Sequence, residues 1–382
     1  MADEKLYMKT IVFGCDPELF IKRNGQIIGA ERLIPREGIE YIPGTFGRDG
    51  NHTSKSNKNG KIVLDGVQLE LNPRANTCRA NLGNEIRALF MKLNDFINPI
   101  NQFIEASELK GGKFELSFDQ VVKIRKKELN SLSESSRTFG CMPSYNVYQP
   151  MGERISKINV DPAKYLYRGG GGHIHLGHCD DNSIKQALKN YDIMVPVLDI
   201  IVGNTCVMLD KNPLNKERRK NYGRAGEYRM PEYGVEYRTL SNFWLKDYQL
   251  MSLVTGLSRL AVNIVANSNE KRDFAKELMA LVDQKDIVKA INNNDATLAK
   301  KNFDKIKGFV ESITRAGDNV PLAKGNIKKF EAFVERGIDH YFKGDPVKNW
   351  IDMPEGHTMG FENFLSSKVR ELEVKQEVVQ NV

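Results

Sequence analysis

The pattern of apolar and polar positions divides the chain into a strand-rich first part and a helix-rich last part. Short apolar runs at Thr10–Phe13 and Leu19–Lys22, and the alternation within Ile62–Leu71, predict strands. Asn24-Gly25 is typical of a tight hairpin turn. Between these strands and the middle of the chain, apolar residues recur at helical spacing over Asn81–Phe103.

The middle of the chain mixes short strands with irregular stretches. Phe114–Val122 and Tyr165–Tyr167 have an extended pattern, Ser183–Leu209 has a helical one, and Val235–Leu240 is the last clear strand. Residues 44–60 contain four glycines and almost no apolar residue. Long polar loops inside compact domains often bind ligands, so this stretch is expected to be a lid or a binding loop.

After Asp247 the pattern becomes helical. Residues 247–343 read as successive helices, and Ser366–Val379 as a final helix with one charged and one apolar face. We therefore expect an α+β protein with a β-rich body over residues 1–245 and a helical region over residues 246–382 packed against it.

Composition places the chain among globular proteins. Of its 382 residues, 40% are hydrophobic and 27% are charged, which allows a sizeable core. The apolar stretch 193–209 is interrupted by Pro196, Asp199 and Asn204, so we expect no membrane span. The sequence MADEKLYMKT lacks the features of a secretory signal, which favours the cytoplasm. The five cysteines form no CxxC pair, and a disulfide framework or zinc ribbon is not expected.

The net charge of +7 suits anionic partners such as nucleotide phosphates, acidic substrates or nucleic acid. Basic residues gather at Lys123–Lys127 and Lys216–Lys220. Two solvated surface stretches explain these runs equally well.

The first candidate chemistry lies on two acidic strands. Asp16 and Glu18 are two residues apart, so an extended backbone points both side chains to one face. Two such carboxylates repel each other when buried unless a cation lies between them. Glu70 stands between Leu69 and Leu71 on another expected strand, where simple solvent exposure is the alternative explanation.

A histidine motif follows a run of four glycines, residues 169–172. On a strand, His173 and His175 share a face, so one could bind a metal while the other contacts a phosphate or orients a ligand. The glycines permit close approach of the backbone to a ligand, but no GK[ST] sequence follows, so they do not form a Walker loop. A core histidine pair behind a flexible loop is the alternative.

The last motif combines guanidinium groups with a carboxylate. Arg224, Arg229 and Arg238 are fixed positive charges suited to phosphate oxygens. Glu236 shares a strand face with Arg238, which would place a metal-binding carboxylate beside a neutralising charge. An exposed, salt-bridged strand explains any one of these residues but less easily all four.

These motifs, in this order, resemble those of the glutamine synthetase and glutamate–cysteine ligase superfamily. RAGEYRMP…GVEYRTL is similar to the end of the glutamine synthetase active site, although Gly234 replaces the first arginine of its last strand. GGGGHIHLG resembles the histidine motifs of both groups, and GCDPELF and VQLELN resemble the acidic strands of the ligases. With GCMPSYN, the closest similarity over about residues 8–245 is to the phage-type COOH–NH2 ligase branch.

The resemblance implies a curved antiparallel sheet of the glutamine synthetase half-barrel type, flanked by helices. It also implies an ATP-dependent ligase that joins a carboxylate to an amine through an acyl phosphate. The substrates would be small molecules or peptides, and the location would be the host cytoplasm if a phage encodes the protein. Whether the protein is an oligomer stays open.

The same resemblance assigns roles to individual residues. Arg229 and Arg238, assisted by Arg224 and His175, would bind the phosphates of ATP or the acyl phosphate, and Asp65 would accept the proton of the amine. We expect the cation-binding residues to converge on one cluster. The ligands implied for Mg²⁺ or Mn²⁺ are Asp16, Glu18, Glu70, His173 and Glu236.

Two other functions stay open. A guanidino-kinase-like phosphotransferase would share the phosphoryl-transfer apparatus but stop at a phosphorylated nitrogen. A non-catalytic nucleic-acid- or virion-associated binding protein is suggested by the basic runs and by residues 44–60. Nucleic acid is the less favoured partner, because binding alone would not require the three glutamates together with His173.

Overall fold

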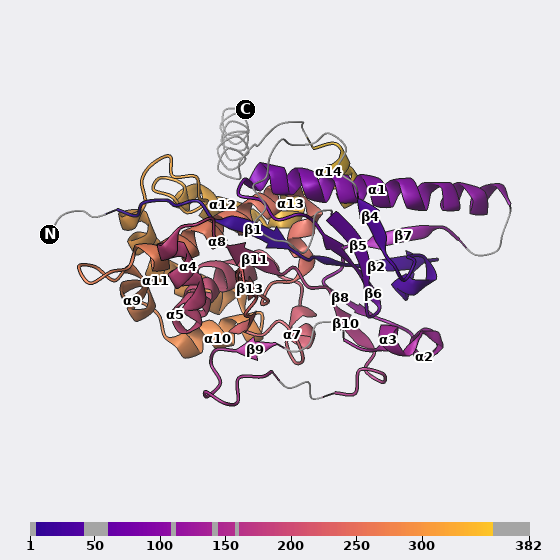
Figure 1. Cartoon of the computed structure of the whole chain (residues 1–382), viewed down its shortest axis with the longest axis horizontal. Coiled ribbons are helices and arrows are strands. Elements are labelled where there is room, and N and C mark those ends of the chain that lie inside the picture. The colour runs from indigo at the N-terminus through magenta and orange to yellow at the C-terminus, as the bar shows by residue number, and fades with distance from the viewer. Residues whose placement is uncertain (1–4, 42–59, 108–111, 140–143, 157–159, 354–382) are drawn as a thin grey trace, which may run out of the picture.

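The computed structural model describes residues 5–41, 60–107, 112–139, 144–156 and 160–353. Antiparallel strands form open sheets in the first two thirds of the chain, and helices dominate the last third, which confirms the predicted α+β class (Figure 1). Residues 44–59 of the expected loop and the expected helix at 366–379 lie outside the described residues.

A five-stranded sheet carries the histidine and arginine motifs. Its order is β1 (Val12–Cys15), β11 (Ile174–Gly177), β13 (Gly234–Tyr237), β12 (Glu227–Arg229) and β9 (Tyr145–Asn146). All neighbours are antiparallel, and the register places Gly14, His175, Glu236 and Arg229 in one cross-strand row. Because neighbouring rows alternate between the two faces of a sheet, the next row points to the opposite face. That row is Cys15, Ile174, Tyr237 and Tyr228.

A second sheet carries the acidic strands. Its order is β3 (Gln26–Ile28), β2 (Glu18–Arg23), β6 (Gln68–Asn72), β5 (Gly60–Asp65) and β4 (Ile39–Tyr41), with β7 (Phe114–Ser117) also paired to β2. Asn24 and Gly25 both have positive φ at the predicted β2–β3 hairpin. The stretch 62–71 forms two strands, because the chain reverses at Gly66, where φ is 59°. A separate pair joins β10 (Tyr167–Gly169) to β8 (Val121–Lys123).

A connection of two residues joins the two larger sheets. β1 belongs to the five-stranded sheet and β2 to the second sheet, so Asp16 and Pro17 carry the chain from one to the other. The strands that carry the predicted site residues are therefore divided between two sheets, where we expected one. As a consequence, Asp16 and Glu18 face partners from different sheets.

The helices cover these sheets. Helix α1 (Arg79–Ala106) crosses the second sheet, contacting β4 and β5 (Figure 1). The predicted helix 183–209 is interrupted into α4 (Asn182–Lys189), α5 (Tyr191–Leu198), a π-helical turn (Asp199–Gly203) and α6 (Asn204–Val207). Shorter helices between the strands are η1 (Ala30–Arg32), α2 (Lys126–Ser131), α3 (Glu134–Arg137) and α7 (Asn215–Arg218), and η3 (Asn242–Lys246) follows the last strand, β13.

The last third of the described chain is helical, as predicted. After α8 (Tyr248–Asn267) it contains α9 (Phe274–Ala280), α10 (Gln284–Asn292), α11 (Ala296–Ile313), α12 (Ile327–Arg336), α13 (Ile338–Tyr341) and α14 (Pro346–Ile351). Helix α8 is long and apolar enough to cross a membrane by length and composition alone. Most of its apolar surface is buried inside the protein, as in the central helix of a globular core.

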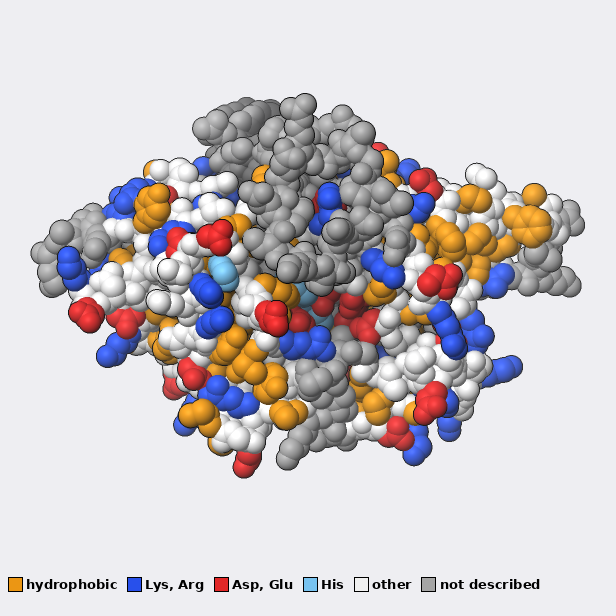
Figure 2. Space-filling view, in the orientation of Figure 1, with side chains coloured by type: hydrophobic (Ala, Val, Ile, Leu, Met, Phe, Trp, Pro, Cys, Tyr) orange, Lys and Arg blue, Asp and Glu red, His pale blue; other side chains and the backbone are white. Residues whose placement is uncertain are grey.

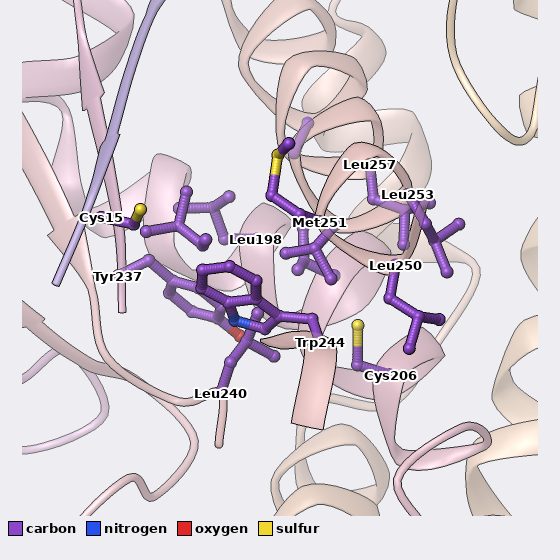
Figure 3. Close-up of a cluster of buried hydrophobic side chains, with 14 of the residues drawn as sticks. Cys15, Leu198, Cys206, Tyr237, Leu240, Trp244, Leu250, Met251, Leu253 and Leu257 are labelled. Carbon is purple, nitrogen blue, oxygen red and sulfur yellow. The ribbon is translucent and has the colours of Figure 1, made fainter. Parts of the chain in front are cut away.

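The core joins the five-stranded sheet to α8. Figure 3 shows the indole of Trp244 between Tyr237 of β13 and the apolar side chains of α8, including Leu250 and Leu253. All four of these side chains are fully buried. Burying each of the two leucines contributes roughly 1.5–3 kcal/mol, and the larger aromatic side chains bury more surface still, so this cluster fixes β13 against the helices. The core contains residues from both sides of residue 245, and a division there stays a prediction.

The N-terminal segment is held by the C-terminal helices. Leu6 donates its backbone N–H to the carbonyl of Ile313 at 2.8 Å, and its own carbonyl accepts from Arg315 at 2.8 Å. Lys9 donates its N–H to Oδ1 of Asn263 on α8 at 2.6 Å. These bonds fix the approach of the chain to β1, and therefore the position of the residues that follow it.

Candidate active site

The predicted site residues gather where the two sheets meet. Figure 2 shows carboxylate, histidine and basic side chains together near the middle of one face of the molecule. Among the described residues, two sets of side chains could each hold a metal ion, with the donor atoms in each set within 4.8 Å of one another. We call them the histidine group (Asp16, His173 and Glu236) and the acidic group (Glu18, Asp65 and Glu70).

The histidine group is buried at the start of β11, which His173 directly precedes. His173 Nδ1 lies 2.8 Å from Oδ1 of Asp16 and 3.9 Å from Oε1 of Glu236. His175 Nε2 lies 3.3 Å from the other oxygen of Asp16, so both histidines share a face, as predicted. Burial opposes ionisation of Asp16, but the two imidazoles outweigh it and hold the pKa of Asp16 well below its usual range. Burial lowers the pKa of His175, but Asp16 more than compensates and raises it overall.

Glu18 anchors the acidic group. Its side chain is fully buried and accepts hydrogen bonds from the backbone N–H of Gly171 at 2.7 Å and from the amide of Gln68 at 2.8 Å. Glu70 lies directly opposite Glu18 in the β2–β6 pair. It accepts one hydrogen bond from Asn72 at 2.8 Å. Like charges placed opposite each other in a sheet are destabilising unless something neutralises them.

The carboxylates of this group lie close enough to change the pKa of Glu70. Burial, and then the carboxylates of Asp16, Asp65 and Glu18, raise the pKa of Glu70 well above its usual range. The effect of Asp16 shows that the two groups act on each other electrostatically. A bound cation would remove this repulsion.

The arginines divide between two partners. Arg238 is fully buried, with Nε 3.0 Å from Oε1 of Glu236, and Nη1 of Arg229 lies 3.5 Å from the same oxygen. Arg224 instead pairs with the buried Glu227 at 2.8 Å. Arg229 and Arg238 therefore converge on the histidine group, whereas Arg224 is held beside them by the carboxylate of Glu227.

The donor sets fit divalent cations. Oxygen ligands lie about 2.0–2.6 Å from Mg²⁺, Mn²⁺ or Ca²⁺, so ligands on opposite sides of one ion are at most about 5 Å apart. The 4.8 Å limit of both groups meets this condition. In addition, the buried Oε1 of Glu236 accepts no hydrogen bond from any described residue, despite the charged neighbours around it. Carboxylates with one imidazole suit Mg²⁺ or Mn²⁺.

Tyr222 is a site residue that the sequence gave no reason to select. Its hydroxyl lies 3.1 Å from Oε1 of Glu18 and is hydrogen-bonded to Nε2 of His173, so it touches both groups. Its ring faces the guanidinium groups of Arg218 and Arg238, at 4.6 and 5.4 Å from the ring centre. Tyr222 lies in a turn rather than on a strand, and periodicity therefore gives no signal for it.

All ten predicted site residues lie in or beside this region, but the expected single cluster is two groups. Asp65, predicted to accept a proton, lies in the acidic group with Glu18 and Glu70. The individual roles stay predictions.

The explanation of the basic run 216–220 as a solvated surface stretch is wrong in part. Arg218 and Arg219 are buried, and Arg218 donates to the carbonyls of Thr239 and Leu240 at 3.0 and 2.6 Å. Arg218 therefore supports the loop after β13, and Arg219 donates to Oδ1 of Asn294 at 2.6 Å, so neither side chain faces solvent.

The four glycines before His173 allow parts of the protein itself to pack closely. A Cβ atom on Gly172 would lie 2.5 Å from Nε1 of Trp244, and one on Gly171 would collide with the Tyr222 hydroxyl and the His173 ring. The carbonyl of Gly172 accepts the indole hydrogen bond of Trp244 at 3.1 Å. These glycines therefore position Glu18, His173 and Tyr222.

We expect Gly172→Ala to lower the free energy of unfolding by about 1–3 kcal/mol, because the added methyl group overpacks the Trp244 contact. Urea unfolding followed by Trp fluorescence measures it. Gly308→Ala is the matched control, since a Cβ there meets nothing within 4 Å on helix α11. This control should be neutral or stabilising by up to about 1 kcal/mol. Equal stability of the Gly172 variant and the wild type would contradict the packing argument.

Comparison with known proteins shows that part of the chain is similar to one protein family. Residues 164–316 match the family model described as phage phiEco32-like COOH.NH2 ligase-type 2. No curated protein and no solved structure gives a significant match to the chain. The family name indicates a carboxylate–amine ligase, the branch that the sequence motifs resemble.

The matched region contains His173, His175 and Glu236 with the three arginines, but not Asp16 or the acidic group. It also extends past residue 245 into helix α11, whereas we expected the resemblance to end at about residue 245. The helices α8 to α11 are therefore part of what the chain shares with this family.

Proposed function

We propose that this protein is an ATP-dependent ligase that forms an amide between a carboxylate and an amine. The observation that carries the proposal is the family match over the segment that contains His173, Arg229, Glu236 and Arg238. The two groups of metal-compatible donors beside these arginines support it, because phosphoryl transfer from ATP commonly requires divalent cations and fixed positive charge.

The reaction would have two steps. An oxygen of the substrate carboxylate attacks the γ-phosphorus of ATP, and the bond to the β,γ-bridging oxygen breaks, so that ADP leaves with the electron pair. The neutral amine then attacks the carbonyl carbon of the acyl phosphate, phosphate leaves, and the nitrogen loses a proton. Position and charge stabilisation supply most of the rate in such sites.

The chain's own residues would bind and orient the reacting groups. Bound Mg²⁺ or Mn²⁺ would supply charge neutralisation at the phosphates. Arg229 has a partly exposed side chain and can reach a substrate phosphate, whereas Arg238 is buried and keeps Glu236 in place. His175 lies 3.3 Å from Asp16 through Nε2 and is hydrogen-bonded to the Tyr233 hydroxyl at 2.7 Å through Nδ1, so donation to a phosphate oxygen would replace one of these two contacts. Asp65 is a ligand candidate as well as the predicted proton acceptor.

The test is incubation of the protein with ATP, Mg²⁺ or Mn²⁺, and pooled small carboxylates, peptides and amines. We expect equal release of ADP and phosphate, and a new mass equal to acid plus amine minus water. Hydroxylamine in place of the amine should trap the acyl phosphate as a hydroxamate.

The alternatives give different products. ADP release with a phosphorylated nitrogen and no free phosphate would favour the guanidino-kinase-like enzyme. No ADP with any pool, together with DNA binding that weakens steeply with salt, would favour the non-catalytic alternative and overturn the proposal.

A further inference from the structure

We infer that Tyr222 is a positioning residue that fixes the tautomer of His173 and links the two cation groups. The inference rests on the proposed function only in that both groups are taken to bind divalent cations. It concerns cation binding itself and can be tested without a substrate.

The structure holds the Tyr222 hydroxyl in one place. Its oxygen contacts Oε1 of Glu18 at 3.1 Å and Nε2 of His173. Gly171 leaves the space for this contact, since a Cβ there would collide with both the hydroxyl and the imidazole. The guanidinium groups of Arg218 and Arg238, which are both buried, lie over the ring at 4.6 and 5.4 Å from its centre. Cations facing an aromatic ring attract it and limit its movement.

Counting hydrogens then gives the direction of each bond. A phenol has one hydrogen and a carboxylate has none, so Tyr222 donates its hydrogen to Glu18. The remaining contact of the phenol oxygen, with Nε2 of His173, must therefore be donated by the imidazole. In a neutral imidazole this leaves a lone pair on Nδ1, the nitrogen that lies 2.8 Å from Oδ1 of Asp16 and 3.9 Å from Glu236.

This arrangement is the one that a metal-binding histidine needs. A lone pair and a carboxylate oxygen 2.8 Å apart require a proton or a cation between them. Histidines that ligate metals almost always donate their other ring N–H to an oxygen, which fixes the tautomer and the ring. Tyr222 supplies that oxygen to His173 and passes the hydrogen bond on to Glu18. The two groups are thereby connected through three side chains.

The first experiment compares Mn²⁺ binding to the metal-free wild type and to Tyr222→Phe by calorimetry, without ATP. The variant keeps the ring that contacts the two arginines but removes the acceptor of the His173 N–H and the donor to Glu18. We expect the dissociation constant of at least one Mn²⁺ to rise by about 10–100-fold.

Tyr165→Phe is the matched control. It removes another hydrogen bond from a tyrosine to a carboxylate, that of Glu217, which belongs to neither cation group. Its Mn²⁺ isotherm should equal that of the wild type. Unchanged Mn²⁺ affinity in a folded Tyr222→Phe protein would overturn the inference while leaving the proposed ligase function intact.

A second measurement uses the unaltered protein. With ¹⁵N-labelled histidine and saturating Mg²⁺, the ring nitrogens of His173, assigned from a His173→Gln spectrum, should show hydrogen on Nε2 and none on Nδ1. A merely structural role for Tyr222 would not require this tautomer. Hydrogen on Nδ1 in the Mg²⁺-saturated protein, or no binding of Mg²⁺ or Mn²⁺ by the wild type, would also overturn the inference.

Discussion

Glu236→Gln should lower ADP formation by about 10³-fold or more while the protein stays folded. Oε1 of Glu236 is the point on which Arg229, Arg238 and His173 converge. The amide keeps the size of the side chain but removes the negative charge that Arg238 and a cation in the histidine group require. Losing electrostatic stabilisation of this kind commonly costs about 10²–10³-fold, and losing a metal costs more.

The measurement is ADP release at saturating ATP and Mg²⁺, with circular dichroism and gel filtration to confirm folding. Glu115→Gln is the matched control, because Glu115 is an exposed strand glutamate on β7, outside both groups. It should retain wild-type turnover. A folded Glu236→Gln protein with wild-type turnover would exclude Glu236 from the active site.

Millimolar Mn²⁺ should raise the melting temperature of the protein by several degrees relative to EDTA. A ligand that binds only the folded state stabilises it by about 2.7 kcal/mol per site at 100 times its dissociation constant. Here the cation also removes the repulsion among Glu18, Asp65 and Glu70. Differential scanning fluorimetry with EDTA, Mg²⁺ and Mn²⁺ measures the effect.

Glu70→Gln tests this prediction further, because its effect on stability should have opposite signs in EDTA and in Mn²⁺. In EDTA the variant should be more stable than the wild type, since one of three facing carboxylates is gone. In Mn²⁺ it should be less stable, since a ligand is gone. If the two proteins melt alike under both conditions, Glu70 neither suffers repulsion nor binds the ion.

The pH dependence follows from the same carboxylate. Burial, with the charges of Asp16, Asp65 and Glu18, raises the pKa of Glu70 in the folded state above its unfolded value. Between the unfolded and the folded pKa, the native state therefore binds more protons than the unfolded state, and stability falls as pH rises. EDTA-treated protein should show this loss on titration upward from about pH 4.5, and Glu70→Gln should not.

Sequence patterns predicted the elements that depend on local information. The Asn24-Gly25 hairpin, helix α1 and the succession of C-terminal helices follow from turn chemistry and periodicity, and the structure confirms them. The site residues could be selected because acidic, imidazole and guanidinium groups on apolar strands need a chemical reason. Each of the strands carrying Glu18, Glu70 and Glu236 presents that glutamate among buried neighbours.

The relations between elements could not be predicted in the same way. Whether β1 and β2 belong to one sheet depends on their partners β11 and β6, which lie far away in sequence. The π-helical turn after α5 begins at the buried Asp199, whose carboxylate accepts hydrogen bonds from the distant Tyr148 at 2.9 Å and Tyr237 at 2.6 Å. Tyr222 gives no signal in the sequence for the same reason, because its importance lies in contacts with Glu18 and His173.

The hydrogen bonds that hold the N-terminal segment against the C-terminal helices have a consequence for how the protein folds. Asp16 and Glu18 are synthesised early, but the segment that leads to them is fixed by Asn263 and Arg315, partners 254 and 309 residues distant from the residues they bind. Contacts so distant in sequence make folding slow, because the chain loses much entropy before they form. The carboxylates would therefore remain unassembled on the ribosome until the helical region has emerged. Assembly of the site is therefore expected to depend on the helical region, whatever that region contributes to turnover.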